Sequence, residues 1–153
     1  MKKFKYSMEN ILQVNIKLED QAKIAYSNAR MILNREEEKL EEYIKRKMKY
    51  ESELRNLTNS KLDIKKIKLC REAIEVMESK IRQQRIVVKN AEARVEAARV
   101  KLNDAMVERK TQENLKEKAF QEYLIELDLE ERKEVDELIS FRYGKPAIDE
   151  ENG

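Results

Sequence analysis

The side chains in this sequence that are best suited to chemistry are carboxylates, lysines, arginines, one thiol and a few tyrosines. Histidine, the usual general base near neutral pH and the commonest transition-metal ligand, does not occur in the 153 residues. The consecutive carboxylates Glu36, Glu37 and Glu38 suit a di-metal carboxylate bundle, but such centres also need Glu-x-x-His ligands from a four-helix core. A solvated helix face is therefore the better interpretation. The sequence predicts no catalytic residue, no metal site and no cofactor, and so no enzyme.

Glycine and proline, which break helices and build phosphate-binding loops, occur only at Gly144, Pro146 and Gly153. Residues 1–143 therefore cannot form a P-loop or a dinucleotide-binding turn. Charged residues make up 42% of the chain and apolar residues 41%. Ordinary globular domains contain roughly 45–50% apolar residues. This composition is typical of long helices and coiled coils, not of a compact core.

Cys70 is the single cysteine, and it has no partner for a disulfide within the chain, which suits a reducing compartment. We predict that it is a small core residue and not a reactive thiol. The longest aliphatic run, Ile86–Val88, is too short to span a membrane. The basic opening Met1–Tyr6 lacks the apolar region of a signal peptide. We expect a cytoplasmic protein.

Apolar side chains recur at alternating steps of three and four residues, the spacing of a coiled-coil seam. In the second half nearly every position of a strict heptad is apolar: Ile67, Cys70, Ile74, Met77, Ile81, Gln84, Val88, Ala91, Val95, Ala98, Leu102, Ala105, Arg109 and Gln112. In the first half we place the matching seam at Ile11, Asn15, Leu18, Ala22, Ala25, Ala29, Ile32 and Glu36, after which the pattern loosens.

A polar stretch at residues 57–63 separates the two seams, and within it Ser60 and Asp63 resemble a capping box. If the chain reverses near residue 60, paired residues have numbers that add up to about 120. Leu18 then lies opposite Leu102. The polar seam residues Glu36 and Gln84 also fall opposite each other, which neither seam imposes by itself.

We therefore predict an all-α fold, a long antiparallel two-helix coiled-coil hairpin over residues 1–144 with an overhanging C-terminal helix. The first helix is expected at about 7–57, after an N-cap at Ser7, and the turn at about 58–60. The second helix is expected at about 61–143, where Gly144 and Pro146 end it. Residues 145–153 are expected to form a disordered tail.

By the same pairing rule, everything beyond about residue 113 has no partner within the chain. This overhang is rich in large apolar side chains, and the stretch from Glu117 to Glu137 is strongly acidic. A lone helix that exposes such a stripe to water is marginal. It can insert into another protein, self-associate or fold back, and we favour insertion.

The stretch from Lys45 to Arg71, around the expected turn, is basic. The opposite charges of the two regions favour two different partners. Nucleic acid is a weaker alternative for the basic region, because few aromatic side chains are available to stack on bases. Tyr43 and Tyr50 share a helix face with Arg46 between them, and these residue types often anchor interfaces.

Three stretches resemble the flagellar FliJ family, and the resemblance covers nearly the whole chain. They are Phe4–Leu12 followed by Gln21 and Ala22, the middle stretch from Ile81 to Lys118, and Glu130–Leu138 with Arg142 and Tyr143. The resemblance implies a two-helix coiled coil similar to the central stalk of rotary ATPases. It further implies a non-enzymatic component of the flagellar export apparatus that inserts both termini into the hexameric export ATPase, links it to the membrane export gate and escorts export chaperones.

The resemblance also implies two sets of contact residues. The predicted ATPase-binding residues are Phe120, Tyr123, Leu124, Leu127, Glu131, Val135, Leu138 and Phe141. The predicted export-gate contacts are Lys39, Tyr43, Arg46, Tyr50, Ala73, Met77, Lys80 and Gln84. We expect a monomer in isolation that is recruited through its partners to the cytoplasmic face of the membrane at the flagellar base, without nucleic acid. The alternatives are a generic coiled coil that self-associates and a nucleic-acid binder at the basic region.

Overall fold

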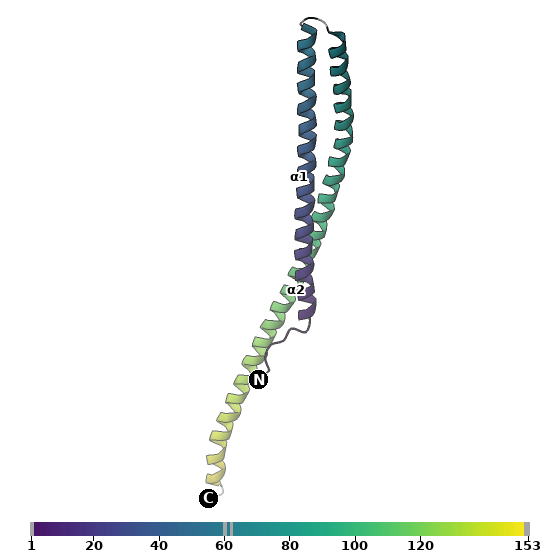
Figure 1. Ribbon diagram of the computed structural model, residues 1–153. Coiled ribbons are helices and arrows are strands. Elements are labelled where there is room, and N and C mark those ends of the chain that lie inside the picture. Colours follow the sequence, from purple (N-terminus) through teal and green to yellow (C-terminus); the bar gives the residue numbers. More distant parts are fainter. Residues whose placement is uncertain (1, 60, 62, 152–153) are drawn as a thin grey trace. The chain divides into compact units, whose positions relative to one another are not determined.

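Two long helices packed against each other as a hairpin make up the fold (Figure 1). The computed structural model describes residues 2–59, 61 and 63–151, with α1 at Glu9–Asn59 and α2 at Ile64–Glu151. The predicted all-α class is confirmed, and the described residues contain no strand. No stretch of these helices is both long and apolar enough to cross a membrane.

The chain divides into two units, and each contains part of both helices. One unit is Leu18–Met106, and the other combines Met1–Lys17 with Val107–Gly153. Within Leu18–Met106 the buried side chains form a strip on α2, namely Cys70, Met77, Ile81, Gln84, Val88 and Ala91, and α1 adds the buried Glu19. All described positions of the predicted α2 seam are buried or half-buried. A strict heptad repeat therefore located this face of α2 correctly.

The predicted seam of α1 is only half right. Its positions Asn15, Ala22, Ala29 and Glu36 are half-buried, but the alternate row is exposed: Ile11, Leu18, Ala25 and Ile32. The row that turns inward lies one residue further along: Leu12, Glu19, Tyr26 and Leu33. Both rows fit a spacing of three and four residues. Only the second continues without interruption through Leu40, Lys47 and Leu54, which are half-buried, so Leu18 lies outside the row that turns inward.

The ends of the helices also differ in detail from those predicted from the sequence. Ser7 lies in a turn, and α1 begins two residues later, after the Glu9 N–H donates to the Tyr6 carbonyl oxygen at 3.2 Å. Asp63 caps α2, because its Oδ1 accepts the N–H of Lys66 at 3.3 Å. Ser60, the expected start of a capping box, lies outside the described residues.

At its other end α2 continues to Glu151 and passes through the residues where the pattern places its end. Gly144 does not adopt the positive φ of a left-handed helix cap, so the expected termination is not formed there. Pro146 removes one backbone donor close to the end of the helix, where few hydrogen bonds remain to be lost. Residues 145–151 are therefore helical, and 152–153 lie outside the described residues.

Candidate partner-binding surfaces

A polar contact between Glu36 and Gln84 fixes the register of the two helices. The Gln84 side-chain amide Nε2 donates to the Glu36 carbonyl oxygen at 2.9 Å and to its carboxylate Oε2 at 2.6 Å. The two numbers add up to 120, as predicted. Nearer the turn, the Cys70 Sγ donates to the Tyr50 carbonyl oxygen at 3.1 Å, again with a sum of 120. Among the described residues, no three His, Cys, Asp or Glu side chains converge as metal ligands would.

The Gln84 hydrogen bond gives Glu36 a titration behaviour that bears on stability. This hydrogen bond is the main cause that holds the pKa of the Glu36 carboxyl group below its ordinary value of 4.5, and the nearby Lys39 acts in the same direction. Lowering the pKa on folding means that the ionised carboxylate stabilises the folded state. This contribution is fully present above the ordinary pKa and is lost as the pH falls through the lowered pKa of the folded protein.

The midpoint of thermal unfolding is therefore expected to fall as the pH is lowered below the ordinary range of a glutamate. Glu36→Gln, which keeps the shape and an acceptor oxygen, should reduce this acid sensitivity, whereas Glu37→Gln on the exposed neighbour should not. The pKa values of Glu9 and Glu96 are lowered as well, so part of the pH dependence should remain. Circular dichroism melts of the three proteins at several acidic pH values measure the effect, and identical pH profiles would contradict it.

The predicted export-gate contacts all belong to the unit Leu18–Met106, but they differ in accessibility. The Lys80 Nζ lies 5.7 Å from the ring centroid of Tyr43, and Tyr50 and Ala73 line one groove. Lys39, Arg46 and Lys80 are exposed, and Tyr43, Tyr50 and Ala73 are half-buried. Met77 and Gln84 are only 4% and 8% exposed. The exposed and half-buried residues of this set can therefore be reached by a partner at least in part. Met77 and Gln84 instead form part of the contact between the helices.

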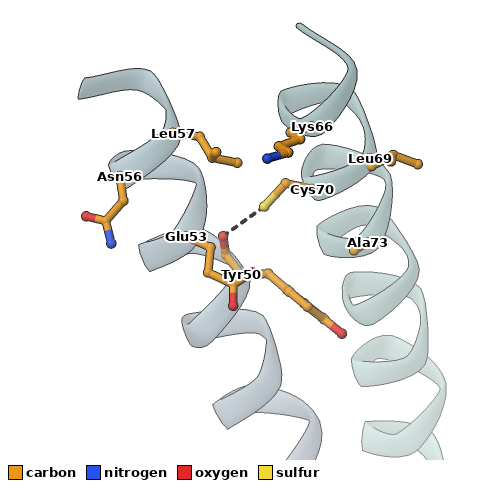
Figure 2. Close-up of a pocket in the computed structure, with 8 residues that line it drawn as sticks. All are labelled: Tyr50, Glu53, Asn56, Leu57, Lys66, Leu69, Cys70 and Ala73. Atoms are coloured by element: carbon orange, nitrogen blue, oxygen red, sulfur yellow. Dashed lines mark hydrogen bonds between the residues drawn. The ribbon is translucent and has the colours of Figure 1, made fainter. Parts of the chain in front are cut away.

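The groove near the turn contains residues that the sequence pattern did not single out. Its lining residues are Tyr50, Glu53, Asn56 and Leu57 from α1 and Lys66, Leu69, Cys70 and Ala73 from α2, and its volume is about 550 Å³. Figure 2 shows these side chains and the hydrogen bond from Cys70. Cys70 is only 8% exposed, so the prediction of a buried core thiol is confirmed. The basic lining residue Lys66 belongs to the basic region around the turn.

In the other unit, part of the predicted ATPase-binding set is covered by the start of the chain. The Phe4 ring centroid lies 5.2 Å from that of Phe120 and 5.5 Å from that of Tyr123. The Tyr123 hydroxyl donates to the Lys2 carbonyl oxygen at 2.9 Å. Phe120, Tyr123 and Leu127 are half-buried. The expectation that nothing beyond about residue 113 has a partner in the chain is therefore wrong.

The reason lies in the different reach of helical and extended backbone. The pairing rule assumes that both segments rise by about 1.5 Å per residue, whereas an extended segment spans roughly 3.3 Å per residue. The residues ahead of α1 are not helical, so the rule does not govern them, and Phe4 reaches Phe120 and Tyr123. Two further contacts hold this region together: an ion pair of 2.9 Å between Lys116 and Glu9, and a hydrogen bond of 2.8 Å from the Tyr6 hydroxyl to Gln112 Oε1.

The rest of the predicted ATPase-binding set is open to solvent. Every side chain from Asp128 to Gly144 is exposed, including the predicted residues Glu131, Val135, Leu138 and Phe141. The side chain of Leu124 is also exposed, to 38% of its surface. The set therefore divides into a part near Phe4 that the chain itself covers and a longer part that remains accessible.

Comparison with protein families gives one match, which covers almost the whole chain. The family model described as flagellar FliJ protein matches residues 4–147. Both predicted contact sets lie inside the matched range. Comparisons with curated proteins and with solved structures gave no match.

Proposed function

Because the chain belongs to the flagellar FliJ family, and is thus a non-enzymatic component of the flagellar export apparatus, we propose that it acts as a stalk inside the hexameric export ATPase. In this role it promotes assembly and turnover of the ring at the flagellar base, on the cytoplasmic side of the membrane. It also links the ring to the membrane export gate and contacts export chaperones.

The observation that carries the proposal is the exposed end of α2. From Asp128 to Gly144 all side chains face solvent, and among them Val135, Leu138 and Phe141 are large and apolar. Burial of apolar surface contributes about 25 cal/mol per Å², so a partner that encloses this helix would bind it with a substantial favourable free energy. The acidic side chains between the apolar ones favour an enclosure with basic groups.

A single slender helix pair inside a six-membered ring would touch neighbouring ATPase subunits differently. Any contact that is stronger with one conformation of a subunit shifts that subunit toward it. Asymmetric contact can therefore place the subunits in different states, which supports ordered turnover. This mechanism requires binding by the overhang and no catalytic residue in the stalk.

The surface that we propose for the export gate belongs to the other unit, Leu18–Met106. Tyr43 and Tyr50 offer half-buried aromatic anchors, and Arg46 and Lys80 offer exposed cations next to them. Aromatic and arginine side chains commonly dominate binding energy at interfaces. Met77 and Gln84 support these anchors from inside the helix contact, because both are buried.

Addition of the protein to the purified export ATPase is expected to raise ATP turnover and to saturate near one chain per ring. Steady-state turnover and sedimentation of the mixture measure the two quantities. No rise in turnover, together with concentration-dependent dimers of the protein alone, would instead support a generic coiled coil. Salt-sensitive binding to nucleic acid that is lost after replacement of Lys65, Lys66 and Lys68 would instead support a nucleic-acid binder at the basic region.

A further inference from the structure

The segment Lys2–Ser7, which we call the strap, precedes α1 without being helical. Three of its residues are lysines: Lys2, Lys3 and Lys5. Positive charge at the start of a helix opposes the helix dipole, so these lysines disfavour an extension of α1 toward the N-terminus. The segment therefore stays outside the helix, and it contacts α2 within the same unit (Figure 1).

The strap occupies positions on α2 that would otherwise suit a helical partner. Lys116, Phe120, Tyr123 and Leu127 continue the seam of α2 at steps of three and four residues, and all four are half-buried. Phe4 meets the Phe120 ring edge-on, with 65° between the ring planes. Aromatic pairs in this arrangement are stabilising beyond the area that they bury. Phe4 is therefore the main apolar anchor of the strap.

The packing around this anchor is open on both sides. A groove of about 1040 Å³ is lined by Lys2, Lys3, Phe4 and Lys5 of the strap and by Ala119, Glu122, Tyr123, Glu126, Leu127 and Glu130 of α2. On the other side, a hollow of about 480 Å³ has Phe4, Leu12, Ile16 and Phe120 among its lining residues. A segment whose aromatic rings are only half-buried, with two hollows beside its anchor, can leave its place more readily than a close-packed core element.

The chemistry of the covered site is specific. Its floor is apolar and aromatic, made by Phe120, Tyr123 and Leu127, and Glu122, Glu126 and Glu130 form an acidic rim. The strap matches it with a phenylalanine flanked by lysines. Opposite charges across such a rim favour the correct partner and speed its association.

We infer that this site on α2 docks a basic segment with an aromatic side chain, that the strap occupies it in the free protein, and that a segment of the export ATPase displaces the strap on binding. The inference rests on the proposed function and adds a regulatory step to it. Binding of the ATPase then competes with an internal occupant, which lowers the apparent affinity of the free chain.

Phe4→Ala is the direct test, with Ser7→Ala as a matched control in the exposed turn. Without its anchor the strap competes less, so Phe4→Ala is expected to raise the affinity for the ATPase roughly tenfold, the value of one good aromatic contact. Hydrogen exchange at residues 116–127 of the free chain should rise in parallel. An unchanged or lower affinity would overturn the inference, since the strap would then be neutral or part of the docking surface.

Two further variants test displacement and charge. In a Cys70→Ser background, Lys3→Cys and Glu122→Cys joined by a short bismaleimide should abolish ATPase stimulation, and full stimulation by the cross-linked protein would contradict displacement. In the Phe4→Ala background, where the strap competes less, Glu122→Gln with Glu126→Gln should weaken ATPase binding several-fold and reduce its salt dependence, whereas Asp128→Asn with Asp136→Asn should do so less. Equal effects of the two pairs would contradict the acidic rim.

Failure of the inference and failure of the proposed function are distinguishable. If neither the unmodified protein nor any variant binds the ATPase, the stalk function is wrong and displacement by the ATPase falls with it. If all of them bind with the same affinity, the stalk function stands and only the role of the strap is wrong.

Discussion

Removal of residues 128–153 is expected to abolish stimulation of the export ATPase and to leave the helical hairpin folded. All buried residues of the described chain lie between Leu12 and Ala91, and the contacts of Phe4 with Phe120 and Tyr123 are retained. The side chains lost from Asp128 to Gly144 are all exposed, so their removal costs the fold little. Far-UV circular dichroism measures the fold, and steady-state turnover of the ATPase measures the stimulation.

Two double variants of the full-length protein test whether ATPase binding depends on one face of α2 or on exposed apolar side chains in general. Val135→Ser with Leu138→Ser changes the proposed ATPase-binding face, and Ile125→Ser with Leu129→Ser changes the opposite face of the same helix. The exposed fractions are similar, at 53% and 68% for the first pair and 62% and 58% for the second. Loss of two interface anchors should weaken binding by tenfold or more. Equal loss from both pairs, or normal stimulation by the truncated protein, would contradict the stalk function.

Ile81→Ala is expected to lower the free energy of unfolding by about 2–4 kcal/mol, the usual cost of removing a buried isoleucine side chain. Ile81 is only 7% exposed and lies in the strip of α2 that faces α1. The hairpin has a single narrow core, so few neighbours can move in to fill the cavity. Urea denaturation followed by circular dichroism measures the change.

Ile86→Ala provides the matched control on the same helix. Ile86 is 62% exposed, so the same truncation there should change the free energy of unfolding by less than about 0.5 kcal/mol. The difference between the two variants reports burial alone, because residue type and helix propensity change identically. A comparable loss from both would show that position 81 is not a core position and that the assigned seam of α2 is incorrect.

The α2 seam and the register of the hairpin could be predicted from the sequence. Every described seam position from Ile67 to Gln112 is at least half-buried, and Glu36 and Gln84 meet as the pairing rule requires. A repeat sustained over many turns defines the side of a helix that packs, because each further heptad excludes alternative faces. The family resemblance rested on residues spread over the same range, and the match over residues 4–147 confirms it.

The α1 seam and the cover over Phe120 could not be predicted in this way. Two adjacent rows of α1 have the same spacing, and the polar Glu19 and the amphipathic Tyr26 made the inward row look less apolar than the outward one. The strap leaves no periodic signal, because it is short and not helical. Its place on α2 depends on contacts between residues more than 100 positions apart, such as Tyr6 with Gln112.

The sequence by itself determined that this protein is a pair of long helices with one break, since it lacks glycine and proline up to residue 143 and repeats its apolar positions every seven residues. Helical periodicity is a local property of each segment, so it can be read without the rest of the molecule. Only the tertiary structure decided which row of α1 turns inward and that Phe4 covers part of the overhang. These features depend on which surfaces pack against each other. Packing is a property of the whole folded chain and cannot be read from one segment alone.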